Sequence, residues 1–424
     1  MADNYKKTTL KNGLRIITVP ARDTKTAAVL VLIKTGSKYE TKEINGISHF
    51  LEHMLFKGTK KHPTTMKIIE PLDQIGGHYN AFTGQEYTGY WAKVDAGHLD
   101  LALDWVSDIY LNSKIEEKEI NREKGTILQE INMILDNPVR HIEDLWIELL
   151  YGDQPAGWDV IGSVGTVKNM EKSQFVDYFK NHYSAKNTVV AVAGNINQER
   201  TIDKIKKYFE TINSRSVKGK LKVKEKQSKP ECLINYKKTD QSHLILGVRA
   251  YNMFHPDRYA LSLLGDILGG YMSSRLFISV RERQGLAYYI SAGADMDTDI
   301  GVLAANAGVD NQKVDRAIKT ILKEFKKISD KKVSQKELQK AKDHIKGSAL
   351  IGMESSDAQA SFYATQELLT NEILTLEEKL GKINKVTVDD IQRVAKDIFK
   401  PEKLNLALIG PFKDKNKFNK LLKI

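Results

Sequence analysis

A five-residue stretch, His49-Phe50-Leu51-Glu52-His53, places a glutamate between two histidines. On an α-helix, residues four positions apart are neighbours on one face, so both imidazoles can reach the same point. Two imidazole nitrogens at one point suit a tetrahedral zinc ion. A carboxylate beside such an ion can take a proton from a zinc-bound water, because the metal lowers the pKa of that water toward neutrality. The stretch therefore predicts a hydrolytic zinc site with Glu52 as general base, against the alternative of a surface helix with two solvated histidines.

A catalytic zinc site needs a third protein ligand and keeps one position open. The segment "SKIEEKEINREKGTILQEINMIL" has helical periodicity, and Ser113 and Glu116 are expected to form a capping box at its start. Within it, Glu123 and Glu130 are seven residues apart, which is two turns along one face. One of them can be the ligand while the other holds a ligand histidine in place. His78, in the glycine-containing stretch "IGGHYNAFT", is the competing candidate.

We expect the helix that carries the histidines to begin at Asn45 or Gly46 and to end by Gly58. The histidines and Glu52 share one stripe of it with Phe56. Its apolar residues lie on the other side and are Ile47, Leu51, Met54 and Leu55. The histidines are therefore not part of the main apolar face, which favours a site over a core position.

The composition is that of a soluble globular protein. The chain has 424 residues, enough for two or three domains, of which 41% are hydrophobic and 28% charged. The formal net charge is +11, and the excess comes from lysines scattered over predicted helix faces, as in "IKTILKEFKKISDKK". No aromatic residues alternate with these lysines as base stacking requires, so we interpret them as a solvated surface and expect no nucleic-acid partner.

Cysteine use and hydropathy indicate the expected compartment. The single cysteine, Cys232, cannot form an intramolecular disulfide. The N-terminal stretch "MADNYKKTTLKNGLRIITVP" lacks the apolar core of a secretory signal, and no run of about 18 apolar residues occurs. We therefore expect a cytoplasmic protein without membrane insertion.

The two halves of the chain resemble each other. Lys34-Thr35 aligns with Arg249-Ala250, and Gly194 aligns with Gly410. The offsets of 215 and 216 residues nearly agree, which indicates an internal duplication. Between the halves lies a polar, lysine-rich stretch, residues 213–231, which we interpret as a linker.

Each half mixes β-branched apolar runs with segments of helical periodicity. Runs such as "NTVVAVAG" and "GVLAANAGV" predict strands, and "DRAIKTILKEFKKI" predicts an amphipathic helix. Because strands and helices do not alternate strictly, we expect an α+β fold with two homologous domains, each a mainly antiparallel sheet backed by helices on one face. The zinc-binding domain is expected at residues 1–212, and the homologous domain without the histidine motif at residues 232–424.

These features together carry a family resemblance. The run from His49 to His53, followed by Glu130, resembles the inverted zinc motif of the pitrilysin-type metallopeptidases, the inverzincins. Further stretches resemble blocks of that family in the same order: "TTLKNGLRIITVP", "GGHYNAFTGQEYTGYW", "REKGTILQEI" and "GGYMSSRLFISVRERQGLAYYISA". The length and the duplicated halves are similar to the short two-domain members, of the mitochondrial processing peptidase type, and to their bacterial relatives.

The resemblance implies a metal site with assigned roles. By this resemblance one Zn2+ ion per chain is bound by His49, His53 and Glu130. Glu52 is then the general base, and Glu123 takes the place of the glutamate that supports a ligand from outside the metal's coordination sphere.

The resemblance also implies residues that handle the substrate. Asn80, Ala81, Phe82 and Thr83 resemble the edge strand on which an extended peptide docks by β-augmentation. In the second half, Arg281 and Tyr288 match an arginine–tyrosine pair. A guanidinium and a phenol suit gripping the substrate backbone and stabilising the oxyanion.

The implied activity is that of a zinc endopeptidase that cleaves peptides or unfolded polypeptide segments inside an enclosed chamber. Chambers of this family contain four such domains, so a two-domain chain implies a dimer in which Arg281 and Tyr288 reach the zinc of the partner. A homodimer would be self-sufficient, and a heterodimer with a related chain is the alternative. The alternative function is a non-catalytic subunit of a processing or respiratory complex, but such relatives degrade the zinc motif, which is intact here.

Overall fold

The computed structural model describes residues 5–424, which fold into two compact units. Unit 1 consists of the chain up to Ile131, Trp158–Leu221 and Ala349–Leu376. Unit 2 consists of Asn132–Gly157, Lys222–Ser348 and Glu377–Ile424. The units therefore differ from the contiguous domains 1–212 and 232–424 that the sequence led us to expect, because each unit includes a segment from the other half of the chain.

The sheet of unit 1 has six strands in the order β1-β2-β6-β3-β5-β4. These strands are β1 (Lys6–Thr9), β2 (Arg15–Pro20), β3 (Thr26–Ile33), β4 (His78–Thr83), β5 (Thr88–Asp95) and β6 (Thr188–Gly194). Only β2 and β6 are parallel, and every other neighbouring pair is antiparallel. Strand β4 is at one end of the sheet, so one of its edges carries no partner strand among the described residues.

The sheet of unit 2 has five strands in the order β7-β11-β8-β10-β9. They are β7 (Glu231–Tyr236), β8 (Gln241–Arg249), β9 (Ala287–Met296), β10 (Gly301–Asp310) and β11 (Leu404–Gly410). Here too only one pair, β7 and β11, is parallel. This order repeats β2-β6-β3-β5-β4 of unit 1, with Gly194 and Gly410 at the ends of equivalent strands. The predicted fold class, two related α+β domains with mainly antiparallel sheets, is confirmed.

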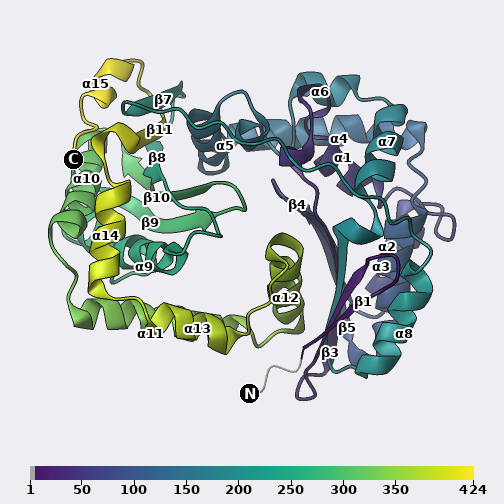
Figure 1. Cartoon of the computed structure of the whole chain (residues 1–424). Helices are drawn as coiled ribbons and strands as arrows, with labels where there is room; N and C mark the ends of the chain where they lie inside the picture. Colours follow the sequence, from purple (N-terminus) through teal and green to yellow (C-terminus); the bar gives the residue numbers. More distant parts are fainter. Residues whose placement is uncertain (1–4) are drawn as a thin grey trace. The chain divides into compact units, whose positions relative to one another are not determined.

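Helices cover the sheet of unit 1. They are α1 (Ile47–Met54), α2 (Thr65–Asp73), α3 (Leu99–Asn112), α4 (Glu117–Asp136), α6 (Val164–Asn169), α7 (Lys172–His182), α8 (Gln198–Phe209) and α12 (Ser356–Thr370). Helix α3 packs on β3 and β5, and α8 packs on β2. Helix α12 comes from the second half of the chain and packs against β2, β3 and β6 (Figure 1).

Helices also pack on the sheet of unit 2. They are α5 (Pro138–Tyr151), α9 (Arg258–Gly269), the π-helical turn Phe277–Glu282, α10 (Val314–Asp330), α11 (Gln335–Gly352), α13 (Leu376–Asn384), α14 (Val388–Ile398) and α15 (Lys415–Asn419). Helix α9, between β8 and β9, occupies the chain position that the histidine helix α1 has between β3 and β4. Helix α5 comes from the first half of the chain and packs on β8 and β11.

The reciprocal placement of α5 and α12 corrects the expectation that helices cover one face of each sheet. Successive residues of a strand point to opposite faces, yet all residues of β6 and β11 are buried, so both faces are covered. In unit 1, α12 supplies Tyr363 to one of these layers, and in unit 2, α5 supplies Trp146. The physical reason is that an apolar strand without alternation requires cover on both sides.

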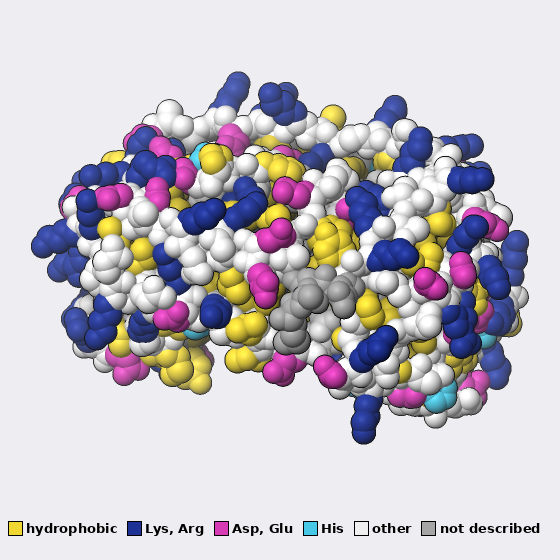
Figure 2. Space-filling view, turned by 60° about the horizontal axis from the view of Figure 1, so that its bottom comes forward, with side chains coloured by type: hydrophobic (Ala, Val, Ile, Leu, Met, Phe, Trp, Pro, Cys, Tyr) yellow, Lys and Arg dark blue, Asp and Glu magenta, His cyan; other side chains and the backbone are white. Residues whose placement is uncertain are grey.

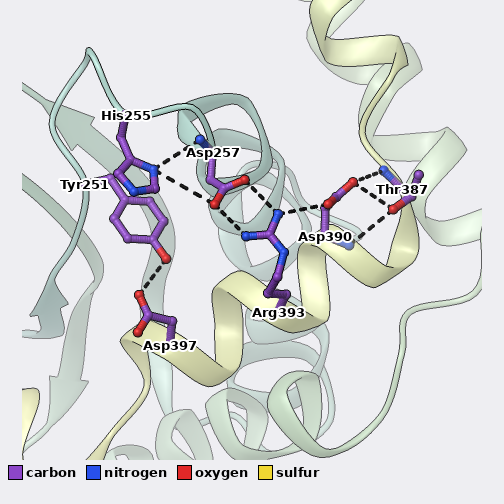
Figure 3. Close-up of polar contacts among 7 residues, drawn as sticks. All are labelled: Tyr251, His255, Asp257, Thr387, Asp390, Arg393 and Asp397. Carbon is purple, nitrogen blue, oxygen red and sulfur yellow. Dashed lines mark hydrogen bonds and ion pairs between the residues drawn. The ribbon is translucent and has the colours of Figure 1, made fainter.

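A polar cluster fixes helix α14 to the loop before α9 within unit 2 (Figure 3). The Arg393 guanidinium donates to Asp257 at 2.5 and 2.7 Å and to Asp390 at 2.9 Å. Nearby, the Tyr251 hydroxyl donates to Asp397 at 2.7 Å, and its ring stacks on His255 at 3.7 Å between centroids. These contacts border the apolar core of unit 2, against which Tyr251 packs, and they join α14 to the segment that precedes α9.

Basic side chains are dispersed over the face shown in Figure 2, with acidic and neutral side chains between them. This distribution agrees with the interpretation of the +11 net charge as a solvated lysine-rich surface. Among the helices of residues 5–424, none combines the length and the hydropathy that crossing a membrane requires.

Candidate metal centre

The histidine motif lies on α1, which begins at Ile47, directly after Gly46 as the sequence predicted. Gly46 has φ of 96°, and a Cβ at this position would lie 2.5 Å from the Ile161 carbonyl oxygen, so glycine is required. The helix ends at Met54, earlier than Gly58, and Phe56 therefore lies beyond the helical stripe on which it was expected. The apolar side that was predicted is fully buried and comprises Ile47, Leu51, Met54 and Leu55.

The predicted glutamate helix is α4, which begins at Glu117 rather than at Ser113. The expected capping box does not form, because the Ser113 hydroxyl instead donates to the Met54 carbonyl at 3.2 Å and Ile115 adopts a positive φ of 49°. Within α4, Glu123 and Glu130 both contact histidines of α1, as their seven-residue spacing indicated.

Three ligand-type side chains converge between α1 and α4. His49 Nε2 lies 3.6 Å from Glu130 Oε1, and His53 Nε2 lies 3.7 Å from Glu130 Oε2. The imidazole ring centroids of the two histidines are 4.7 Å apart, and one ligand atom from each of the three residues lies within 4.8 Å of the others. His78, the competing candidate, is exposed at the start of β4 and is not part of this group.

The spacing of these three donors fits a zinc ion. Two ligand atoms bound at about 2.1 Å to a tetrahedral zinc ion lie about 3.4 Å apart. The two nitrogen–oxygen distances, 3.6 and 3.7 Å, are close to that value and longer than ordinary hydrogen bonds. Two imidazoles and one carboxylate are also the donor set that leaves a fourth position open in catalytic zinc sites.

Glu123 contacts the ring nitrogen of His53 that does not face Glu130. Its Oε1 lies 2.9 Å from His53 Nδ1, which leaves Nε2 of the ring turned toward Glu130. Its Oε2 lies 2.6 Å from the Lys57 ammonium, and hydrogen bonds from His53 and Lys57 hold the pKa of this 4%-exposed carboxyl below its usual value despite burial. Lys57 was not among the site residues expected from the sequence, although its position four residues after His53 indicates a neighbour on a helix face.

The two histidines differ in their electrostatic surroundings. Burial and the neighbouring His53 lower the pKa of His49 to about 3, so His49 is a neutral imidazole at neutral pH, the form that binds metals. Burial alone would also lower the pKa of His53, but the hydrogen bond to Glu123 and the charges of Glu52, Glu123 and Glu130 raise it. The Nδ1 atom of His49 is buried and has no hydrogen-bond partner among the described residues.

Glu52 lies beside this group without belonging to it. Its Oε2 accepts a hydrogen bond of 2.5 Å from the Thr83 hydroxyl at the end of β4. Burial raises the pKa of Glu52, and the Thr83 hydrogen bond and His53 oppose the rise. A carboxyl with a raised pKa and a fixed orientation is suited to accepting and then releasing a proton near neutral pH.

Strand β4 places the four candidate docking residues next to Glu52. Asn80 and Phe82 are exposed and Ala81 and Thr83 are half-buried. The strand pairs with β5 along one edge only, and helix α1 packs beside it. Its open edge presents backbone N–H and C=O groups that an extended peptide can use.

The other two candidate residues belong to unit 2. Arg281 lies in the π-helical turn Phe277–Glu282, and Tyr288 lies on the edge strand β9. The guanidinium carbon is 5.8 Å from the Tyr288 ring centroid and 4.8 Å from that of Phe277. Tyr288 is 73% exposed, which is unusual for a tyrosine and leaves its hydroxyl available to a ligand.

Comparisons with known proteins place the chain in a family. Residues 15–163 match the family described as insulinase (peptidase family M16), and residues 169–345 match the peptidase M16 inactive domain. The "Uncharacterized zinc protease YmxG" of Bacillus subtilis is 36% identical over 96% of this chain and 98% of its own length. A zinc protease of Streptomyces coelicolor is 33% identical over 97% of this chain and 90% of its own length. The chain belongs to peptidase family M16. Both of these bacterial relatives are named zinc proteases.

Solved structures share the fold over nearly the whole chain. A protease from Helicobacter pylori superposes with a TM-score of 0.90 at 26% identity, covering 96% of this chain and 100% of that one. A peptidase M16 inactive domain from Pseudomonas fluorescens has a TM-score of 0.88 at 18% identity, covering 97% and 99%. A chain of complex III from Candida albicans has a TM-score of 0.86 at 19% identity, covering 99% and 100%, which shows that the same fold is also found in that assembly.

Proposed function

We propose that this chain is a zinc-dependent endopeptidase that hydrolyses peptides or unfolded polypeptide segments. The observation that carries the proposal is the convergence of His49, His53 and Glu130 beside a half-buried carboxylate, Glu52, that is not one of the three donors. A purely structural metal site would use four protein ligands and no neighbouring base. The names of the relatives, zinc proteases, support the same conclusion.

In this proposal His49, His53 and Glu130 hold one zinc ion per chain. When bound, the ion acts as a Lewis acid that polarises the scissile carbonyl and lowers the pKa of a water molecule toward neutrality. Glu52 accepts the proton of the attacking water on its carboxylate and later passes it to the nitrogen of the leaving amine. Glu123 keeps the Nε2 atom of His53 directed at the shared point by occupying Nδ1.

The substrate binds in this proposal as an added strand on β4. Backbone groups of Asn80, Ala81, Phe82 and Thr83 pair with the peptide, and adjacent side chains give the preference. Because Thr83 contacts Glu52, a peptide that pairs with the end of β4 runs directly past the general base. Only an extended chain can pair in this way, which restricts the substrates to peptides and unfolded segments.

The second unit contributes the remaining groups. We assign Arg281 to gripping the substrate backbone and Tyr288 to stabilising the oxyanion, because a guanidinium and a phenol donate hydrogen bonds to such oxygens. The proposed assembly is a homodimer that encloses a chamber, in which each chain supplies these two residues to the zinc site of its partner. A heterodimer with a related chain is the alternative assembly.

A metal and activity assay tests the proposal. The purified protein should contain about one zinc per chain and cleave a denatured protein or a peptide library. A chelator should abolish cleavage, and added zinc should restore it. A protein that binds zinc poorly and cleaves nothing would instead be a non-catalytic member of the family.

A further inference from the structure

Another buried glutamate, Glu40, lies beside the N-terminal end of α1. Glu40 is between the 3-10 turns Ser37–Tyr39 and Lys42–Ile44 and is 3% exposed. Its Oε2 accepts hydrogen bonds from the Gly46 backbone N–H at 2.8 Å and from the Asn45 amide at 3.0 Å. Its Oε1 accepts from the Ser48 backbone N–H at 2.8 Å.

These contacts satisfy the N-terminus of the helix. The first backbone N–H groups of an α-helix have no partner inside the helix, and the aligned peptide dipoles make this end positive. The helix residues themselves provide no side-chain cap, since Gly46 is the N-cap position. Glu40 replaces the missing cap with its carboxyl group, and each of its oxygens accepts from N–H groups. Burial raises the pKa of Glu40, and these hydrogen bonds oppose the rise.

Ser48, which directly precedes His49, is held a second time through its side chain. Its hydroxyl lies 2.7 Å from the Tyr178 hydroxyl, which in turn lies 2.8 Å from the Thr35 hydroxyl. The Thr35 hydroxyl is also 3.1 Å from His182 Nδ1. The backbone N–H of Ser48 thus connects the first turn of α1 to Glu40, and its hydroxyl connects the same turn to Tyr178 of α7.

Helix α1 depends on such anchors because it is short. It has 8 residues, about two turns, and isolated helices of this length are not stable in water. A rotation of the helix by one residue would turn each side chain by about 100°, which would move the two imidazoles away from Glu130. The anchor at the first turn therefore determines the rotation at which the donors converge.

We propose that Glu40 is a positioning residue for the metal centre, which anchors the first turn of α1 and thereby sets the geometry in which His49 and His53 meet Glu130. This inference rests on the proposed zinc-peptidase function. It adds a residue that touches neither the metal donors nor the base, and it predicts that zinc affinity depends on a carboxylate nine residues before the first histidine.

The test compares Glu40→Gln with Glu43→Gln as the matched control. Glutamine keeps the size of the side chain but turns an NH2 group toward backbone N–H donors, whereas Glu43 is exposed three residues away. Zinc dissociation constants are measured by chelator competition well below the thermal midpoint of each variant. Glu40→Gln should weaken zinc binding by about 10-fold or more, as loss of an outer supporting group does. Glu43→Gln should bind like the wild type.

Amide hydrogen exchange on the zinc-free proteins gives a readout that does not depend on the proposed function. At least one of the Gly46 and Ser48 amides should exchange faster in Glu40→Gln than in the wild type and in the control, because the glutamine side chain has only one acceptor oxygen for the two N–H groups. Unchanged zinc affinity in a folded Glu40→Gln protein overturns the inference. A wild type that binds no zinc overturns the proposed function instead, while faster exchange would still support the anchoring role.

A second variant covers the case in which Glu40→Gln does not fold. Tyr178→Phe removes one hydroxyl from the Ser48 contact and leaves the ring packing in place. It should weaken zinc binding by less than Glu40→Gln, with little change in the thermal midpoint. If Tyr178→Phe binds zinc as tightly as the wild type, the anchoring of Ser48 does not determine the metal geometry and the inference is wrong.

Discussion

The Thr83 hydroxyl donates a hydrogen bond of 2.5 Å to Glu52 Oε2, which joins the last residue of the edge strand β4 to the candidate base on α1. Because β4 is also the proposed docking strand, the position of the substrate and the orientation of the base are connected through one side chain. Neither residue is close to the other in sequence, so the relationship exists only in the folded protein.

Replacing Thr83 tests this connection. Thr83→Val keeps the shape of the side chain and removes the donor, so we expect kcat to fall by about 10- to 100-fold, the value of one hydrogen bond to a charged group. Zinc content should stay unchanged because Thr83 touches no metal donor. Thr83→Ser is the control, since it restores the hydroxyl and most of the activity. Equal kcat values for the valine variant and the wild type would show that the hydrogen bond does not orient the base.

Glu52→Gln separates metal binding from catalysis. The amide cannot accept a proton, so turnover should fall by about 100- to 10,000-fold, the usual contribution of a general base. Zinc should still bind because Glu52 is not one of the three converging donors. Peptide hydrolysis and metal content are measured on the same preparation. Normal cleavage by this variant would mean that another group accepts the proton.

Lys57 should contribute to zinc affinity although it is not a ligand. Its ammonium is 2.6 Å from Glu123 Oε2, and without it the nearly buried Glu123 carboxylate loses its countercharge. We expect Lys57→Met to raise the zinc dissociation constant by about 10-fold. The exposed Lys60 gives a control, because Lys60→Met removes a charge from the same region without touching Glu123. Equal effects of both variants would indicate only a long-range charge effect.

Subunit mixing tests whether the active site is shared. A chain with Arg281→Ala and Tyr288→Phe is mixed with a Glu52→Gln chain after both are dissociated. If the two units act in trans, each mixed dimer contains one complete site, so an equal mixture should regain about a quarter of wild-type activity. Chromatography must confirm that dimers form. Dimers without recovered activity would argue that each chain completes its own site, whereas full activity of the Arg281→Ala/Tyr288→Phe chain by itself would show that the pair has no catalytic role.

The Arg393 cluster should make stability depend on acidity. Hydrogen bonds from Arg393 hold the pKa of Asp257 and of Asp390 below the usual value. A carboxyl whose pKa is lowered by folding contributes stability above its unfolded pKa of about 3.9, and this contribution is lost as the pH falls through the folded value. Arg393→Met should therefore lower the free energy of unfolding by about 1 kcal/mol at pH 7 and have little effect at pH 2.5. Urea unfolding at both pH values measures the difference, and an equal loss at both would point to packing instead.

Local periodicity was sufficient for much of the fold. The β-branched runs became strands, and the repeat offsets of 215 and 216 residues correspond to two sheets with the same strand order. The continuous burial of β6 was present in the run "TVVAVAG", which does not alternate, but we expected helices on one face only. Which helix would cover the second face was not predictable, because the amphipathic pattern of α5 or α12 does not identify the sheet it packs against.

For the candidate site, the sequence by itself determined which side chains share one face of a helix. His49 and His53 share a helix face because of their spacing, and Glu123 and Glu130 do so for the same reason. Only the tertiary structure decided that these two faces meet, that Thr83 reaches Glu52, and that Glu40 supports the first turn of α1. The spacing along one helix follows from backbone hydrogen bonds between near neighbours, whereas contacts between distant segments follow from the packing of the whole chain around its buried apolar residues.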